Sequence, residues 1–497
     1  MLFNSIEYVF FLPIMVIVYF LIPKVKIRNI WLLAGSYFFY MNWNAAYSLL
    51  LLTATVVTYA GGLMVNELEK RKAYSQRKKC LVVCLMINLG ILCTFKYLTM
   101  LVSYLNVLLA TMHLPRLRLT WNLVLPVGIS FFTLQSIGYL IDVYRGDIAA
   151  EKNFFTYALF VSFFPQLVAG PIERSGNLLV QLKRKRKFKY VYFQKGLVWI
   201  LYGLMVKMVI ADNLSIFVDL VYSDPAEYPG WYLIAATLAF TIQIYCDFYG
   251  YSIIAKGSAY LFGIRLMSNF ESPYYAKSVK EFWRRWHISL STWFRDYLYI
   301  PLGGNRKGPV RRDLNLFIVF LVSGLWHGAS IAFVFWGMLN GIYQIIGNMI
   351  DHAKKRLGID TSDRDSLFCR RFLKNVCTFV LIAFTWIPFR AGNWTETKRI
   401  VHYMIHYLGN YEIISLKNVL SFWETMPSKM AYGAFLGIAI LALVDYLKYR
   451  KKRVVSKVVA QDLWFRYAVC IGLILFVLNC GCYGETYNPA QFIYFQF

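Results

Sequence analysis

Long apolar runs, separated by short loops rich in Lys and Arg, repeat along the chain from residues 3–22 to residues 465–482. An apolar helix of about 20 residues is long enough to cross the hydrocarbon core of a bilayer. The pattern therefore predicts an all-α polytopic membrane protein with roughly eleven spanning helices. Because no stretch is long and polar enough for a separate soluble domain, we expect residues 1–497 to form a single membrane domain.

The basic loops also predict the side of the membrane on which each loop lies, because short loops rich in Lys and Arg stay in the cytoplasm. Basic clusters at residues 70–79, 183–189 and 448–457 are the strongest anchors. Threading the runs between them predicts that both termini lie outside the cell and that residues 390–430 form the longest external segment, with amphipathic structure. The first run, 3–22, lacks the basic start and the cleavage site of a signal peptide, which indicates a retained helix.

Two stretches do not fit a simple crossing. Phe154–Leu182 lies between two cytoplasmic clusters and is interrupted by Pro165 and Pro171, so we expect a broken or re-entrant hairpin there. The run Leu314–Ile350 is too long for one crossing, and basic residues flank both of its ends. It therefore predicts two helices that meet near His327, which puts this histidine deep in the protein.

Composition agrees with a membrane location and narrows the choice of partners. Mean hydropathy is +0.48 and 58% of the residues are hydrophobic, which is far above the soluble average. The formal charge of +27 is spread over the short loops, a pattern that argues against nucleic acid as a partner. The nine cysteines show no metal or redox spacing, so we expect free thiols.

Residues 281–328 are the predicted catalytic core of this otherwise lipid-like chain. They begin EFWRRWHISLSTWFRDYLYIPLGGNRKG and end SGLWHG, with His287 and His327 each preceded by a tryptophan. Ionisable side chains at membrane depth are costly, so they indicate a working site. A neutral imidazole near the midplane is suited to accept the proton of an alcohol that attacks an acyl thioester.

Structural roles for both histidines remain open on the residues alone. His327, between Gly324 and Gly328, could be a packed side chain that bonds to a neighbouring helix. His287 lies in an amphipathic stretch rich in Arg and Trp, which could rest in the membrane interface. Function is favoured because two histidines and a basic, glycine-rich turn lie close together in the sequence.

That turn, Pro301–Gly308 (PLGGNRKG), offers backbone amides and two cations to a phosphorylated donor such as coenzyme A. It lacks the spacing and the Lys-Ser/Thr ending of a Walker motif. A plain cytoplasmic turn is therefore the stronger interpretation of this stretch considered by itself.

Other polar residues in the chain give weaker evidence of a functional site. His402 and His406 are one helical turn apart, but no glutamate follows the first and no third ligand is evident, so we predict no metal site. Asp142, Asp212 and Asp247 lie in apolar runs. We expect Asp247 to pair or hydrogen-bond within the helix bundle.

The core motifs together resemble the membrane-bound O-acyltransferase (MBOAT) family. The similarity is greatest to the bacterial branch with the alginate O-acetyltransferase membrane subunit and the teichoic-acid D-alanyl transferase. It also covers LPVGISFFTLQSIGYLIDVYRG, FPQLVAGPIER and the closing FIYFQF, so it extends over nearly the whole chain. The sequences PLGGNRKG and SGLWHGA, and the length of the chain, resemble the polysaccharide acetyltransferase subgroup more than the D-alanyl one.

The resemblance implies a ring of tilted helices, with re-entrant and amphipathic pieces, around a central catalytic tunnel. His327 matches the deep catalytic histidine of the family's WHG motif, and His287 matches the second histidine of its RRWHxS motif. The candidate substrate-binding residues beside these motifs are Trp326, Trp286, Arg285, Asn305 and Arg306. No metal and no permanently bound cofactor is expected, and acetyl-coenzyme A or a carrier-protein thioester is the expected acyl donor.

The resemblance also implies a function in the bacterial cytoplasmic membrane. An acetyl group would pass from a cytoplasmic thioester across the bilayer to an extracytoplasmic polysaccharide, through an SGNH-type acetyltransferase or esterase partner. One alternative is transfer of D-alanine from a carrier protein to teichoic acid. The other is a polytopic transporter without acyl chemistry, in which broken helices and intramembrane polar groups form a solute pathway.

Overall fold

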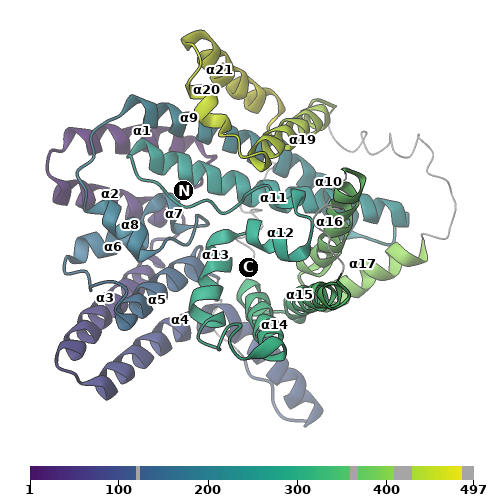
Figure 1. The fold of residues 1–497 in the computed structure, drawn as a ribbon, viewed down its shortest axis with the longest axis horizontal. Coiled ribbons are helices and arrows are strands. Elements are labelled where there is room, and N and C mark those ends of the chain that lie inside the picture. Colours follow the sequence, from purple (N-terminus) through teal and green to yellow (C-terminus); the bar gives the residue numbers. More distant parts are fainter. Residues whose placement is uncertain (119–123, 359–367, 408–427, 484–497) are drawn as a thin grey trace. The chain divides into compact units, whose positions relative to one another are not determined.

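The computed structural model describes residues 1–118, 124–358, 368–407 and 428–483, and the elements in these ranges are helices, without a strand (Figure 1). The chain folds into two compact units. The first comprises Met1–Ile200 and Ile254–Met267, and the second comprises Leu201–Ile253 and Ser268–Gln496. The single membrane domain stays a prediction.

The first unit is formed by the N-terminal helices. Their bounds are α1 Ile6–Leu21, α2 Val25–Met41, α3 Ser48–Lys70, α4 Tyr74–Thr111, α5 Ile129–Arg145, α6 Phe154–Ser162, α7 Phe164–Leu167, α8 Ser175–Leu182 and α9 Tyr190–Leu204, of which the last four residues belong to the second unit.

Glycines in α3 allow its neighbours to approach closely. A Cβ atom at Gly61 would lie 2.6 Å from the sulfur of Cys84 in α4, and one at Gly62 would lie 2.9 Å from the ring of Tyr139 in α5. Small residues at such crossings let helices pack when lipid supplies no hydrophobic driving force. The arrangement is therefore typical of a membrane bundle.

The segment predicted to be broken is divided into α6, α7 and α8. Phe163 ends α6, and Pro165 lies in the first turn of α7, where a missing backbone N–H costs nothing. Gly170 and Pro171 fall between α7 and α8. The interruption is confirmed, and its re-entry into the membrane stays a prediction.

The second unit contains the predicted catalytic core. Its bounds are η1 Met205–Ala211, α10 Asp212–Ser223, α11 Gly230–Leu261 (as far as Ile253), η2 Pro273–Tyr275, α12 Val279–Arg285, α13 Ile288–Phe294, η3 Arg295–Tyr299, α14 Gly308–His327, α15 Ile331–Arg356, α16 Phe368–Ala391, α17 Trp394–His406, α19 Ser428–Tyr449, α20 Val454–Val459 and α21 Leu463–Cys480.

Six of the described helices are long and apolar enough to cross a membrane, namely α3, α4, α11, α16, α19 and α21. The apolar helix α1 is shorter. An all-α polytopic membrane protein is thereby confirmed, while the count of roughly eleven spanning helices stays a prediction. In the expected external segment, α17 buries Thr397 and Ile400 on one face, and residues 408–427 lie outside the described ranges.

The acidic residues of the apolar runs have polar partners. In the first unit, Ser175 donates to the carboxylate of Asp142 at 2.6 Å. In the second, the ammonium group of Lys207 lies 2.6 Å from Asp212 and 2.5 Å from Asp247, and all three side chains are buried. The predicted pairing of Asp247 is confirmed. The nine cysteines are free, as expected.

The long run around His327 forms the predicted pair of helices. Helix α14 ends at His327, and Ser330 caps α15 by accepting a hydrogen bond from the N–H of Ala332 at 3.2 Å. A Cβ atom at Gly324 would lie 2.3 Å from the carbonyl oxygen of Phe333, and one at Gly337 would lie 2.4 Å from that of Phe320. The two backbones are therefore in direct contact, which holds the last turns of α14 against α15.

Candidate active site

His287 lies at a sharp break between α12 and α13, and a neighbouring segment holds this break in place. The N–H of Ile288 donates to the carbonyl of Asn269 at 2.9 Å, and the N–H of Glu271 donates to the carbonyl of Arg285 at 3.0 Å. The side chain of Asn269 also accepts from the N–H of Ser289 at 3.3 Å. Residues 269–271 thus act as a brace on both sides of the histidine.

The backbone of His287 is in the left-handed region, with φ 43° and ψ 53°. This conformation is uncommon for a residue other than glycine and is maintained only where the surroundings over-determine it. The ring atom Nδ1 accepts a hydrogen bond from the N–H of Leu290 at 3.3 Å. Because Nδ1 is the acceptor, the proton of the neutral ring is assigned to Nε2.

The His287 side chain is almost fully enclosed, with 1% of its surface exposed. Burial lowers the pKa of His287 to about 3, because the charged form loses its hydration. Phe248 packs against the ring, with the ring centroids 4.7 Å apart. At neutral pH this histidine is therefore an uncharged hydrogen-bond donor at Nε2.

His327 is the last residue of α14 and is also buried, with 5% of its surface exposed. Three aromatic rings surround it: Trp326 at 4.8 Å, Trp336 at 5.1 Å and Phe389 at 5.2 Å between ring centroids. The carboxyl end of a helix favours positive charge, since the last carbonyl groups point there. The position suits a side chain that gains a proton during a reaction.

Trp326 lies next to both histidines. Its ring centroid is 4.8 Å from that of His327 and 6.2 Å from that of His287, in edge-to-face arrangements. Residues far apart in the sequence therefore converge on one indole ring. This convergence supports the assignment of both histidines to one site.

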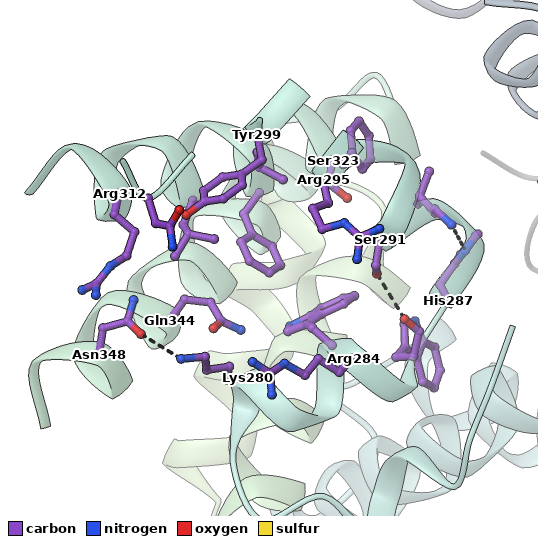
Figure 2. Close-up of a pocket in the computed structure, with 18 of the residues that line it drawn as sticks. Lys280, Arg284, His287, Ser291, Arg295, Tyr299, Arg312, Ser323, Gln344 and Asn348 are labelled. Carbon is purple, nitrogen blue, oxygen red and sulfur yellow. Dashed lines mark hydrogen bonds between the residues drawn. The ribbon is translucent and has the colours of Figure 1, made fainter. Parts of the chain in front are cut away.

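Both histidines line one cavity of about 490 Å³. Its walls come from α12, α13, η3, the turn after η3, α14 and α15 (Figure 2). Apolar and aromatic side chains form much of the lining, among them Trp283, Leu290, Phe294, Val319 and Phe320. The volume suits an elongated organic ligand rather than a single ion.

Four cationic side chains also line the cavity, namely Lys280, Arg284, Arg295 and Arg312. Arg312 pairs with Asp313 at 2.8 Å, and Arg295 pairs with Asp296 at 2.8 Å. In Figure 2, Arg312 lies on the opposite side of the view from His287. The cavity thus combines two imidazoles with four cationic side chains, of which Arg312 lies away from His287.

The predicted substrate-binding residues have different locations. Trp286 and Asn305 line the cavity, and Trp326 lies beside the histidines, although it is not in the cavity lining. Arg285 lies outside the lining, because its guanidinium binds the carboxylate of Glu281 at 2.8 Å and the carbonyl of Glu271 at 3.1 Å. Arg306 is exposed in the turn and is likewise absent from the lining.

Sequence reasoning missed several polar residues of the cavity wall. Helical spacing was the available signal for three of them, since Lys280, Arg284 and Ser291 recur with His287 at intervals of one helical turn. Arg312 and Asn348 gave no such signal. They reach the cavity from α14 and α15, and only the folded hairpin brings them to α12.

The pair His402 and His406 stacks on one face of α17, with ring centroids 5.6 Å apart. In the described ranges, no three His, Cys, Asp or Glu side chains gather in a way that could hold a metal ion. The two rings are explained as neighbours on an amphipathic helix.

Comparison with known proteins points to one family. The sequence model of the membrane-bound O-acyltransferase family matches residues 3–387. A probable alginate O-acetylase of Pseudomonas putida is 36% identical, and the alignment covers 100% of both chains. A peptidoglycan O-acetyltransferase of Helicobacter pylori is 34% identical over 82% of this chain and 80% of its own. A teichoic acid D-alanyltransferase of Bacillus subtilis is 26% identical over 47% of this chain and 62% of its own.

Proposed function

The chain belongs to the membrane-bound O-acyltransferase family and is an acyltransferase, and from this premise we propose that it transfers acetyl groups from cytoplasmic acetyl-coenzyme A toward an extracytoplasmic polysaccharide. The observation that carries the proposal is the cavity whose wall contains His287, His327 and four cations. An imidazole can act as a general base at the acyl group of an acetyl thioester, and cations can bind the phosphates of its carrier.

In the proposed reaction, His327 accepts the proton of the acceptor hydroxyl group. The hydroxyl oxygen forms a bond to the thioester carbonyl carbon, and the carbon–sulfur bond then breaks. The proton passes from His327 to the departing sulfur, so the products are an O-acetyl ester and a free thiol. Atoms and charge balance without a further reactant.

His287 has a different role from His327 in this proposal. Its Nδ1 atom is engaged by the N–H of Leu290, so it contributes the Nε2 proton. Nε2–H donates a hydrogen bond to the carbonyl oxygen as negative charge develops there. A fixed donor in a water-poor site stabilises such an oxyanion without having to reorganise.

The acceptor side of the proposal rests on the relatives. Those that cover most of this chain are named for alginate and for peptidoglycan, both of which are polysaccharides. We propose that an SGNH-type partner outside the cell receives the acetyl group and passes it to the polymer. The basic loops support an orientation with both termini outside the cell, and the bacterial relatives support a location in the bacterial cytoplasmic membrane.

The test uses purified protein in lipid nanodiscs with acetyl-labelled coenzyme A, and follows thiol release and label transfer to a hydroxyl acceptor. Wild type should turn over, and His327→Ala should lose at least about 100-fold in kcat. His402→Ala is the matched control, because His402 is exposed on α17 and does not line the cavity. Equal turnover of His327→Ala and wild type would remove His327 from the chemistry.

D-alanyl transfer to teichoic acid remains the alternative, supported by a relative that aligns with about half of this chain, 47%. A D-alanyl carrier-protein thioester in the same assay tests it directly. Turnover with this donor, and none with acetyl-coenzyme A, would reassign the donor while leaving His327 in place. A transporter without acyl chemistry does not agree with membership of an acyltransferase family.

A further inference from the structure

A second cavity of about 520 Å³ lies in the second unit, next to the candidate active site. It is formed by the start of α12, the carboxyl-terminal half of α15 and the first half of α16. Lys280 and Gln344 line both cavities, and they lie close together in Figure 2. Nothing in the proposed reaction uses the second cavity.

The lining of this second cavity is amphiphilic. One carboxylate, that of Asp351, and four cationic side chains line it, and the cations are Lys277, Lys280, Arg370 and Lys374. The remaining wall is largely apolar and open to the surroundings. Leu373 is 60% exposed and Ile346 is 47% exposed, and both line the cavity.

The position of the cavity along α16 matches the depth of lipid headgroups. Helix α16 is a candidate membrane span, and Arg370 and Lys374 lie in its first two turns. Lys354, Lys355 and Arg356 end the preceding helix α15. Positive charge at both ends of this connection predicts that it lies at the cytoplasmic surface, where membranes carry anionic lipid.

We propose that this cavity binds the headgroup of an anionic phospholipid, with the phosphate between the cations and the acyl chains along Leu373, Ile346 and their apolar neighbours. Basic pockets between membrane helices at the cytoplasmic side have the charge to bind such headgroups. The exposed apolar wall favours a lipid over the polar nucleotide end of coenzyme A, which has no chains to cover it.

The shared wall couples this lipid site to the candidate active site. The ammonium group of Lys280 donates to the side-chain oxygen of Asn348 at 3.5 Å, and Asn348 in turn donates to Asp313 at 2.9 Å. Asp313 also pairs with Arg312 of the catalytic cavity. A lipid phosphate that attracts Lys280 alters the hydrogen bond between Lys280 and Asn348, which is the first of these contacts. Lipid binding therefore changes the positions of the cationic side chains near the acyl donor.

The test is native mass spectrometry of the detergent-purified protein with equal amounts of phosphatidylglycerol and phosphatidylcholine that have the same acyl chains. Wild type should retain phosphatidylglycerol about tenfold better, and this preference should fall as ionic strength rises. The variant Arg370→Gln/Lys374→Gln should lose it. The variant Lys355→Gln/Arg356→Gln removes the same charge outside the cavity and should keep it.

Two further variants keep the test decisive if the double glutamine variant does not fold. Arg370→Lys/Lys374→Arg preserves the charge and should bind as wild type does. Leu373→Glu adds a carboxylate at an exposed position of the cavity and should abolish the preference. Equal retention of the two lipids by wild type would overturn the proposal. Displacement of phosphatidylglycerol by free coenzyme A would also overturn it, and would assign the cavity to the donor.

Discussion

The Nδ1 atom of His287 accepts a hydrogen bond from the backbone N–H of Leu290 at 3.3 Å. A neutral imidazole with Nδ1 engaged in this way presents a donor, Nε2–H, to whatever binds beside it. The two histidines of the cavity are therefore not equivalent. In the proposed reaction His327 moves a proton, and His287 holds one in place.

The role of His287 as a hydrogen-bond donor predicts the order of kcat among variants at this position. A glutamine amide can put an N–H near the position of Nε2, whereas alanine cannot. We expect His287→Ala to lower kcat by about 100- to 1,000-fold and His287→Gln to lower kcat by less. The measurement is thiol release from acetyl-coenzyme A at saturating donor, with KM determined in parallel. Equal kcat for the two variants would contradict a donor at Nε2.

The enclosure of His287 predicts a pH dependence of stability. The folded-state pKa, about 3, is below the ordinary value of 6.5. The unfolded chain therefore binds more protons between these values, so the free energy of unfolding falls as pH decreases from 6.5 toward 3 and is unaffected by this group above 6.5. Thermal unfolding of His287→Gln should lose part of this acid sensitivity. His402→Gln, at an exposed position, should keep the wild-type slope.

The helix break at His327 was predictable, because its apolar run is twice the length of a span and both of its ends are basic. The conformation of His287 was not. Its positive φ depends on the hydrogen bonds that Asn269 accepts from Ile288 and that Glu271 donates to Arg285, which local sequence patterns do not reveal. The sequence also did not show that Arg284, and not Arg285, lines the cavity. Adjacent residues point about 100° apart around a helix, and the elements that face α12 were unknown.

The contact between α14 and α15 predicts that a substitution of Gly324 strongly lowers both activity and stability. A methyl group there would lie 2.3 Å from the carbonyl oxygen of Phe333, so Gly324→Ala must push the helices apart and displace His327. We expect a large loss of kcat together with a lower unfolding temperature. Gly472→Ala in α21 is the matched control, since nothing lies within 4 Å of its added methyl group and it lines neither cavity. Wild-type turnover by Gly324→Ala would show that the hairpin does not position His327.

Helix α19 lies beyond residues 3–387, the part matched by the family model, yet it contacts Ser272, the residue that follows the brace next to His287. The hydroxyl of Tyr245 donates to the carboxylate of Asp445 at 2.6 Å, and Ser272 donates to the carbonyl of Asp445 at 2.8 Å. The Tyr245 ring also packs on Trp286, with centroids 6.0 Å apart. Helix α19 is therefore a support for the catalytic segment.

A double-mutant cycle measures that support. Tyr245→Phe and Asp445→Asn should each lower the free energy of unfolding by about 1–3 kcal/mol, because a buried hydrogen bond to a carboxylate is lost or weakened. Their combined effect should be smaller than the sum of the two, since both remove the same bond. Thermal unfolding in a fixed detergent gives the comparison, and kcat should fall in the same order. Strictly additive effects would contradict a direct coupling.

The buried cation Lys207 predicts the largest stability effect of a single substitution. Its ammonium group lies between Asp212 and Asp247 at 2.6 and 2.5 Å, and all three side chains are at least 90% enclosed. Lys207→Gln leaves two carboxylates without their cation, so we expect a loss of about 3–5 kcal/mol in the free energy of unfolding. Asp247→Asn should cost less, because Lys207 then still pairs with Asp212. The neutral triple variant, Lys207→Gln/Asp212→Asn/Asp247→Asn, should recover much of the loss, since no buried charge remains unpaired. A triple variant less stable than Lys207→Gln would show that the ion pairs, and not the isolated carboxylates, determine the effect.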